Sequence, residues 1–299
     1  MAEQQTRMSH EPRVAALMAC HNRVSCTVQS VSALKGQICS GVSLDLVLVD
    51  DGSSDGTAHE VAKIFPNATI LCGDGSLFWS GGVRWAFSVA MQGDYDFYLW
   101  LNDDTHLDQD ALARLTRTYR EVESKAGNTV IVVGSTRDPE TGLFSYGGWR
   151  QRPGRLGLTT WEKTPPDMEH PIPCDTINGN CALIPRAVVQ RVGNLDPVFS
   201  QGFGDLDYGL RAAKSGCQIM IAPGYFGTCK NNEGAGMWTD KSLPIFSRWQ
   251  KLLGPKGLPV KPWGVFTRRH KGRLWPLSWI APYVLFWFTA FSPLSRNRK

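Results

Sequence analysis

Two runs of apolar residues in this chain each end in a pair of adjacent aspartates. Residues 44–49 lead into Asp50-Asp51, and residues 97–101 lead into Asn102-Asp103-Asp104. A short apolar run is typical of a strand buried in a parallel sheet, and open α/β sheets bind ligands beyond the carboxyl ends of their strands. We therefore expect both acidic pairs at one edge of a sheet, where they would hold a divalent cation and a phosphorylated ligand such as a nucleotide. Ordinary turns and helix caps are the alternative interpretation of both pairs.

Strand-like and helix-like segments alternate along the chain. Apolar runs predict strands at 13–20, 44–49, 68–72, 97–101, 129–134, 181–184 and 218–222. Apolar residues at helical spacing separate most of these runs, and Asp108 is the expected N-cap of one such helix. The alternation predicts an α/β fold with a mostly parallel central sheet, right-handed crossovers and helices on both faces.

The charges are distributed unevenly. The chain has 32 Lys and Arg against 27 Asp and Glu, yet twelve of the basic residues and none of the acidic ones follow Asp240. A hydrophobic content of 42% and a charged content of 20% are those of a folded globular protein. The polar residues 1–12 are predicted to be a disordered N-terminus without a secretory signal, and the scattered cysteines indicate free thiols in a reducing compartment.

The last part of the chain, residues 241–299, is basic and aromatic. Residues 274–295 contain no charged side chain, and basic residues flank them on both sides. Such a length nominally suffices to span a bilayer, but the internal prolines, the aromatic side chains and the basic flanks favour an anchor lying in the membrane interface. The basic residues would attract anionic lipid. The alternative is an aromatic tail that packs on the rest of the protein.

A third acidic cluster follows a glycine-rich segment. Asp205 and Asp207 stand at the start of a predicted helix, directly after residues 201–204. A helix N-terminus favours the ionised form of a carboxylate, as a general base at neutral pH requires. Plain N-capping is the alternative here. The dinucleotide fingerprint GxGxxG is absent, so a dinucleotide-binding fold is not supported.

Taken in order, four motifs resemble those of family-2 glycosyltransferases, which are inverting enzymes of the GT-A fold. They are ACHN at 19–22, VDDGSSDGT at 49–57, LNDDT at 101–105 and GFGDLDYGLR at 202–211. The resemblance covers about residues 13–235 and is closest to the rhamnosyltransferase-like enzymes of bacterial polysaccharide synthesis. It implies a GT-A domain, which we place at residues 13–240, and the basic, aromatic segment 241–299, predicted above to associate with the membrane, follows this domain.

The resemblance also implies how a nucleotide-diphosphate sugar donor would be held. Asp51 would recognise the base, with help from the backbone near Ala19. Asp104 would ligate Mn²⁺ or Mg²⁺ bridging the diphosphate, and Asp103 would face the ribose or the sugar. The donor pocket would be completed by Gly81, Gly82 and Arg84.

On the acceptor side, the resemblance implies that Asp205 is the catalytic base and that Asp207 lies nearby. Two departures from the family pattern stand out. Gly204 occupies a position that is usually acidic, and residues 222–230 contain no histidine that would assist the metal. Lys230 is a possible electrostatic substitute there, with a solvated surface lysine as the alternative.

The sequence thus predicts a metal-dependent enzyme that transfers a sugar, with inversion, to a glycan or lipid-linked acceptor in cell-surface polysaccharide synthesis. Its expected location is peripheral, at the cytoplasmic face of the inner (plasma) membrane. Its expected partners are the donor, the acceptor and the anionic membrane surface, and no nucleic acid. Two alternatives remain open: a nucleotidyltransferase, and a non-catalytic membrane-bound binder of sugars or nucleotides.

Overall fold

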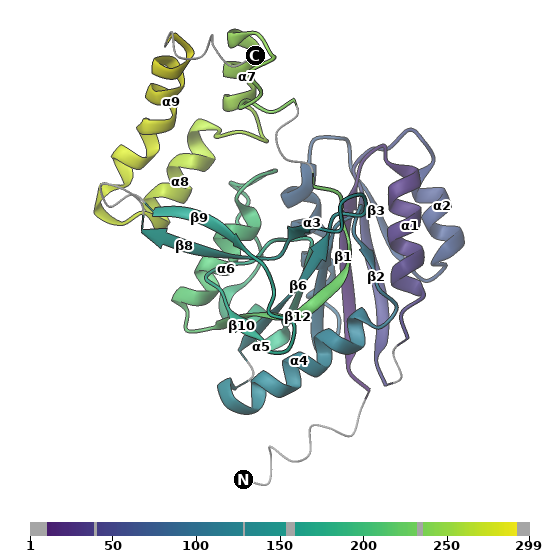
Figure 1. Ribbon diagram of the computed structural model, residues 1–299. Helices are drawn as coiled ribbons and strands as arrows, with labels where there is room; N and C mark the ends of the chain where they lie inside the picture. Colours follow the sequence, from purple (N-terminus) through teal and green to yellow (C-terminus); the bar gives the residue numbers. More distant parts are fainter. Residues whose placement is uncertain (1–10, 39–40, 128, 154–158, 232–235, 292–299) are drawn as a thin grey trace.

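The computed structural model describes residues 11–38, 41–127, 129–153, 159–231 and 236–291 (Figure 1). Most of the predicted disordered segment 1–12 and the final basic residues of the tail lie outside these ranges. A single large sheet runs through the described part of the chain. Its strand order is β10-β12-β6-β11-β4-β1-β2-β3, with β5 and β7 paired to β12 and β6.

One half of the sheet is parallel, as predicted. It consists of β1 (Arg13–Cys20), β2 (Ser43–Asp50), β3 (Thr69–Cys72) and β4 (Phe97–Leu101). The whole sheet is nevertheless mixed, because β11 (Cys181–Pro185) lies antiparallel between β4 and β6 (Val130–Arg137). The remaining strands are β5 (His106–Leu107), β7 (Phe144–Tyr146), β10 (Ile172–Pro173) and β12 (Gln218–Thr228), with a separate hairpin of β8 (Gly148–Pro153) and β9 (Thr159–Thr164).

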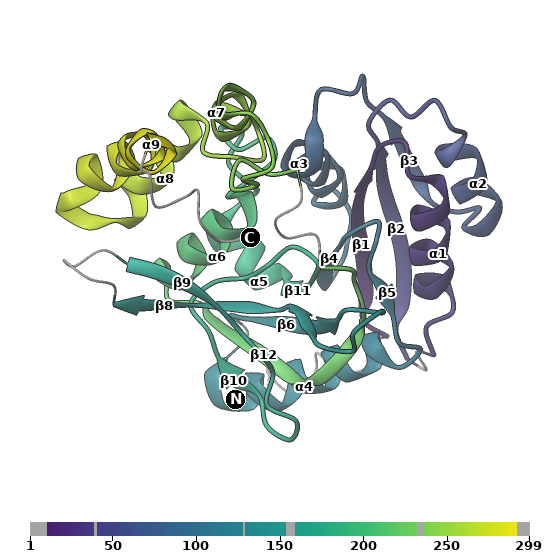
Figure 2. The ribbon, with the colours of Figure 1, turned by 45° about the horizontal axis from the view of Figure 1, so that its top comes forward.

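Helices cover both faces of the sheet (Figure 2). They are α1 (Val24–Lys35), α2 (Thr57–Ile64) and α4 (Ala111–Ala126) on one face, and α3 (Phe78–Ala90), α5 (Arg186–Val192) and α6 (Gly204–Lys214) on the other. Successive residues of β1 alternate between the two layers: Ala16 and Met18 join one core, and Leu17 and Ala19 join the other. All of these side chains are buried, so β1 is a fully covered central strand.

Two predicted boundaries are wrong. Helix α4 begins at Ala111, with Asp110 as the residue before it, and the amide of Asp108 donates to the carbonyl oxygen of Phe226. Strand β12 continues beyond residue 222 to Thr228, with shifts in its pairing to β6 between Ile221 and Thr228. The longer strand carries the chain to the carboxyl edge of the sheet.

Three helices form the C-terminal part: α7 (Ile245–Leu253), α8 (Val260–His270) and α9 (Trp275–Phe291). Figures 1 and 2 show them grouped beside α6 and the β8–β9 hairpin, away from α1 and α2. Phe266 of α8 packs with Phe199 and with Leu210 of α6. Part of the predicted tail therefore packs on the α/β domain.

A buried carboxylate also fastens α8 to α6. Asp207 has no exposed surface, and its oxygens lie 2.7 Å from Arg269 Nη1, 2.8 Å from His270 Nε2 and 2.8 Å from Arg211 Nε. Burial alone would raise the pKa of Asp207, but the hydrogen bonds from His270, Arg211 and Arg269 outweigh it and lower that pKa. Arg269 also pairs with Asp196 at 2.8 Å. A buried charge with this many partners holds the two helices in one arrangement.

Helix α9 has two apolar sides. Tyr283 and Phe286 face inward and form a small core with Leu252 of α7. On the opposite side Leu277, Ile280, Val284 and Phe288 are exposed, Phe288 by 72%. Within the described ranges, no helix is long and apolar enough to cross a membrane.

The approach of α3 to the sheet depends on Gly82. A Cβ at Gly82 would lie 2.6 Å from Ala19 Cβ, whereas one at the neighbouring Gly81 would make an ordinary 3.4 Å contact with Leu77. We expect Gly82→Ala to destabilise the protein by about 1–3 kcal/mol through overpacking. The matched control, Gly81→Ala, should be neutral or stabilising by up to about 1 kcal/mol, because alanine favours helix. Urea denaturation measures both, and equal effects would contradict this account.

Candidate active site

The acidic pair after β4 lies at the carboxyl edge of the sheet, as predicted, and shares one cation. Arg23 Nη1 lies 3.1 Å from Asp103 Oδ1, and Arg23 Nη2 lies 2.8 Å from Asp104 Oδ2. Arg23 comes from the loop that follows β1, the strand paired to β4. The Asp103 side chain is 8% exposed and that of Asp104 is 14% exposed. Burial raises the pKa of Asp103 to about 6, against the lowering effect of Arg23.

A second segment, residues 178–180, joins this pair to Asp205. Asn102 Nδ2 donates to Asn180 Oδ1 at 3.0 Å, directly beside the acidic pair. The amide of Gly179 donates to Asp205 Oδ2 at 3.1 Å. A Cβ at Gly179 would meet the Trp79 ring at 2.1 Å, so only glycine fits between that ring and Asp205. The structure thus connects the predicted metal-binding and catalytic aspartates through one short stretch of backbone.

Asp205 stands in the first turn of α6, with its carboxylate oriented by backbone amides. Besides the bond from Gly179, its Oδ1 accepts one from the amide of Leu206 at 2.8 Å. The surrounding protein shields the carboxylate from water, which raises the pKa of Asp205, while the backbone hydrogen bonds oppose the shift. The expectation that the helix N-terminus favours the ionised form is therefore wrong in its net result, because burial outweighs it. The raised pKa gives the carboxylate more affinity for the proton that a general base accepts.

Cys229 lies beside the acidic pair. It belongs to the segment 222–230, which contains no histidine. Its thiol lies 3.5 Å from Asp104 Oδ1 and 3.1 Å from Asn180 Nδ2. Burial and, after it, the negative charge of Asp104 raise the pKa of Cys229 to about 12, so the group stays a neutral thiol at pH 7. A neutral thiol donates to the Asp104 carboxylate and is a poor ligand for a hard cation.

The acidic pair itself fits Mn²⁺ or Mg²⁺. Carboxylate oxygens are the ligands these ions prefer, and such ions commonly take one or two of them and fill the other positions with phosphate oxygens and water. Within the described ranges, no group of three or more His, Cys, Asp or Glu is placed to hold a metal. Asp103 and Asp104 would hold the ion, and phosphate oxygens of the donor and water would complete its coordination.

We expected the carboxylate of Asp51 to be free to contact a base, but it is bonded within the protein. It is buried, and its oxygens accept hydrogen bonds from the amides of Gly75, Leu77 and Phe78 at 2.9–3.0 Å. These bonds shape the loop that enters α3. Ala19, at the end of β1, is 7% exposed, and its methyl group packs against α3.

The three residues expected to complete a donor pocket all lie on α3. Gly81 and Gly82 are buried, the first with its amide bonded to the carbonyl oxygen of Ser200 and the second against β1. Their positions therefore support helix packing. Arg84 is half-buried, and its Nε is buried without a hydrogen-bond partner among the described residues.

The structure also bears on the expectations for Asp207 and Lys230. Asp207 cannot contact an acceptor, because its carboxylate is enclosed by Arg211, Arg269 and His270. Lys230 pairs with Glu140 at 2.7 Å on the surface, which matches the alternative of a solvated lysine.

Sequence reasoning assigned no role to Arg23, Asn180 or Cys229. Arg23 follows the ACHN motif directly, so its place after a strand was a usable signal. Asn180 and Cys229 carry no local signal, because each reaches the site through pairing between distant strands.

The family model of glycosyl transferase family 2 matches residues 16–191, more than half of the chain. The chain belongs to this family. The match ends before Asp205, so that residue's role does not follow from it. No curated protein sequence matches the chain.

Many solved structures share the fold, including these two. One is GalNAc-T7 with UDP, GalNAc and Mn²⁺, with a TM-score of 0.54 and 14% identity over 72% of this chain. The other is the mannosyltransferase PcManGT from Pyrobaculum calidifontis in complex with GDP-Man and Mn²⁺, with a TM-score of 0.53 and 17% identity over 87% of this chain. The chain spans 43% and 65% of those two proteins. At these identities the likeness establishes the GT-A fold.

The pKa of Asp103 predicts a pH dependence of stability. Its folded value of about 6 exceeds the ordinary 3.8, so as pH rises the unfolded chain loses this proton first and the group's contribution to the free energy of unfolding falls. Asp103→Asn cannot titrate, so between pH 4 and pH 7 its free energy of unfolding should rise by about 2 kcal/mol relative to that of the wild type. Denaturation in EDTA measures the difference, with Asp110→Asn as the control. A constant difference across this range would contradict the prediction.

Proposed function

We propose that this protein is a metal-dependent, inverting glycosyltransferase that moves a sugar from a nucleoside-diphosphate donor to a glycan or lipid-linked acceptor in cell-surface polysaccharide synthesis. The observation that carries the proposal is the hydrogen-bonded link from Asp205 through Gly179 and Asn180 to Asn102, the residue before the acidic pair. A carboxylate linked in this way to the pair supports a base that acts next to a metal-bound diphosphate. The identity of the donor sugar, with rhamnose as the first candidate, is part of the proposal.

In the proposed reaction Asp205 accepts the proton of the acceptor hydroxyl. The hydroxyl oxygen attacks the anomeric carbon from the side opposite the diphosphate, and the bond between that carbon and the diphosphate oxygen breaks with inversion. The nucleoside diphosphate leaves with the electron pair. Arg23, held at the acidic pair, adds positive charge where the leaving group develops negative charge. A bound Mn²⁺ or Mg²⁺ would neutralise the diphosphate further.

Release of nucleoside diphosphate tests this function. The protein is incubated with a panel of nucleotide sugars, with Mn²⁺, Mg²⁺ or EDTA, and the released nucleotide is identified. We expect nucleoside diphosphate, dependence on the metal, and a loss of about 100-fold or more in turnover for Asp205→Asn. Asp110→Asn, which removes an exposed carboxylate, should keep wild-type turnover.

The alternatives give other results. A nucleotidyltransferase would release pyrophosphate from a nucleoside triphosphate, and a non-catalytic binder would show saturable donor binding without turnover. Unchanged turnover in Asp205→Asn would contradict the proposed base.

We also propose that the protein works at the cytoplasmic face of the membrane, held there by the exposed side of α9. Leu277, Ile280, Val284 and Phe288 recur at helical spacing and are 42–72% exposed. A helix that is apolar on all sides but covered on one needs a second apolar environment. The basic composition after Asp240, with no acidic residue, complements an anionic lipid surface. A lipid-linked acceptor would be reached there.

Vesicle flotation tests the membrane surface. The full chain should float with phosphatidylglycerol-containing vesicles, less in high salt, and the variant Val284→Glu/Phe288→Glu should lose at least tenfold in partitioning. The matched control is Leu143→Glu/Met168→Glu, which makes the same charge change at exposed apolar side chains of the α/β domain. Equal flotation of the two variants would contradict the role of α9.

A further inference from the structure

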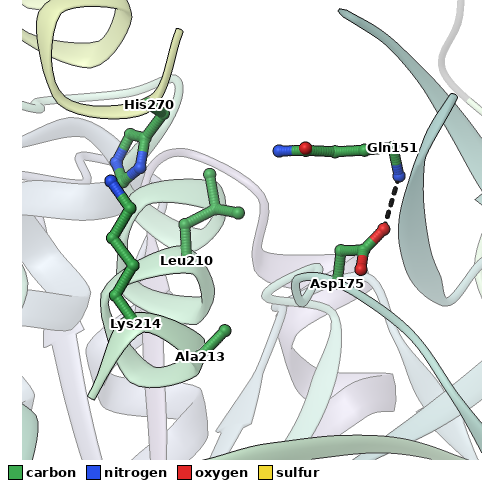
Figure 3. A pocket seen from close by; sticks show the side chains of 6 residues that line it. All are labelled: Gln151, Asp175, Leu210, Ala213, Lys214 and His270. Atoms are coloured by element: carbon green, nitrogen blue, oxygen red, sulfur yellow. Dashed lines mark hydrogen bonds between the residues drawn. The ribbon is translucent and has the colours of Figure 1, made fainter. Parts of the chain in front are cut away.

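A cavity of about 350 Å³ lies on the C-terminal half of α6 (Figure 3). Residues of α6 and α8 line one side, and residues of β8 and of the segment after β10 line the other. The lining residues are Gln151, Asp175, Leu210, Ala213, Lys214 and His270. None of them belongs to the site described above.

The lining selects a ligand that is polar but uncharged. Lys214 and Asp175 lie on opposite sides and offset each other in charge, so the cavity has no excess of either sign. Gln151 adds an amide that both donates and accepts, which suits hydroxyl groups. Leu210 and Ala213 provide an apolar surface between these groups. Sugars combine hydroxyls with apolar C–H faces in the same way.

A buried nitrogen at this cavity lacks a partner. His270 Nε2 lies 2.8 Å from Asp207 Oδ1, but His270 Nδ1 is buried and has no hydrogen-bond partner among the described residues. Burial lowers the pKa of His270, although Asp207 opposes the shift, so the ring is neutral and Nδ1 accepts a hydrogen bond. Buried polar atoms are normally paired, so a ligand hydroxyl or a water that reaches His270 Nδ1 would complete its hydrogen bonding.

Two segments of the chain link the lining of the cavity to Asp205. Along α6, Leu210 follows Asp205 by five residues, an axial rise of about 7.5 Å. Beside the helix runs the segment 175–180, which begins at the cavity with Asp175 and reaches Asp205 through the amide of Gly179. In between, Thr176 Oγ1 donates to the carbonyl oxygen of Leu206 at 2.8 Å. The separation is one that a short oligosaccharide spans.

We propose that this cavity is a subsite for a neutral saccharide unit of the acceptor, remote from the hydroxyl that reacts at Asp205. The proposal rests on the proposed function. The C–H face of the sugar lies on Leu210 and Ala213, and its hydroxyls bond to Gln151, Asp175 and the imidazole of His270. Because His270 belongs to α8, the C-terminal helices form part of this acceptor site.

Saturation-transfer NMR on the full chain tests the subsite with lactose, maltose, cellobiose and N,N′-diacetylchitobiose as probes. We expect at least one of them to bind the wild type at millimolar concentration. Ala213→Phe, at an exposed helix position, fills the cavity and should weaken that binding at least tenfold. Gln151→Met, which keeps the side-chain length, should weaken it several-fold. Ala62→Phe, the same change at an exposed position of α2, should bind as the wild type does.

Binding of none of the four probes by the wild type, or equal binding by the wild type and Ala213→Phe, would overturn the subsite. Release of nucleoside diphosphate from the donor is measured on the same samples. If wild type and Ala213→Phe both release it, the proposed function stands whatever the probes show. If the wild type releases none while a probe binds in the cavity, the proposed function fails and the saccharide site remains.

Discussion

The antiparallel placement of β11 is the constraint on which the site depends. Because β11 runs against β4 and β6, its first residue lies at the carboxyl edge of the parallel strands, and the residues before it lie at that edge too. Asn180 therefore meets Asn102, and Gly179 meets Asp205. A parallel strand in the same place would carry residues 178–180 to the opposite edge, and the two groups of aspartates would lose their connection.

Helix α6 is held by partners of two kinds. At its first turn the backbone of Gly179 orients Asp205, and in the same turn Asp207 is enclosed by basic side chains from α6 and α8. The two aspartates are two residues apart and differ in their surroundings. Burial raises the pKa of Asp205, whereas the pKa of Asp207 is lowered because hydrogen bonds from His270, Arg211 and Arg269 outweigh its burial.

Much of the fold was predictable from the sequence because apolar periodicity is a local property. The central strands and the helices of the first half follow from it, as does the place of Asp103 and Asp104 after β4. The direction of β11, the pairing of Arg23 with both aspartates and the burial of Asp207 were not predictable, because each depends on contacts between segments distant in the chain. Asp51 shows the same limit: its motif predicted a ligand contact, and three amides of a later loop take up its carboxylate.

The contacts of Arg211, Arg269 and His270 with Asp207 also have a consequence for how the chain can be divided. Composition changes sharply after Asp240, which suggests a natural place to cut or to exchange one C-terminal segment for another. A cut there would remove Arg269 and His270. Of the three contacts, the buried carboxylate of Asp207 would keep only the ion pair with Arg211. A chimera would fold well only if the incoming segment brought its own cation to the same spot on α6. The boundary visible in composition is therefore not a boundary between independent folding units.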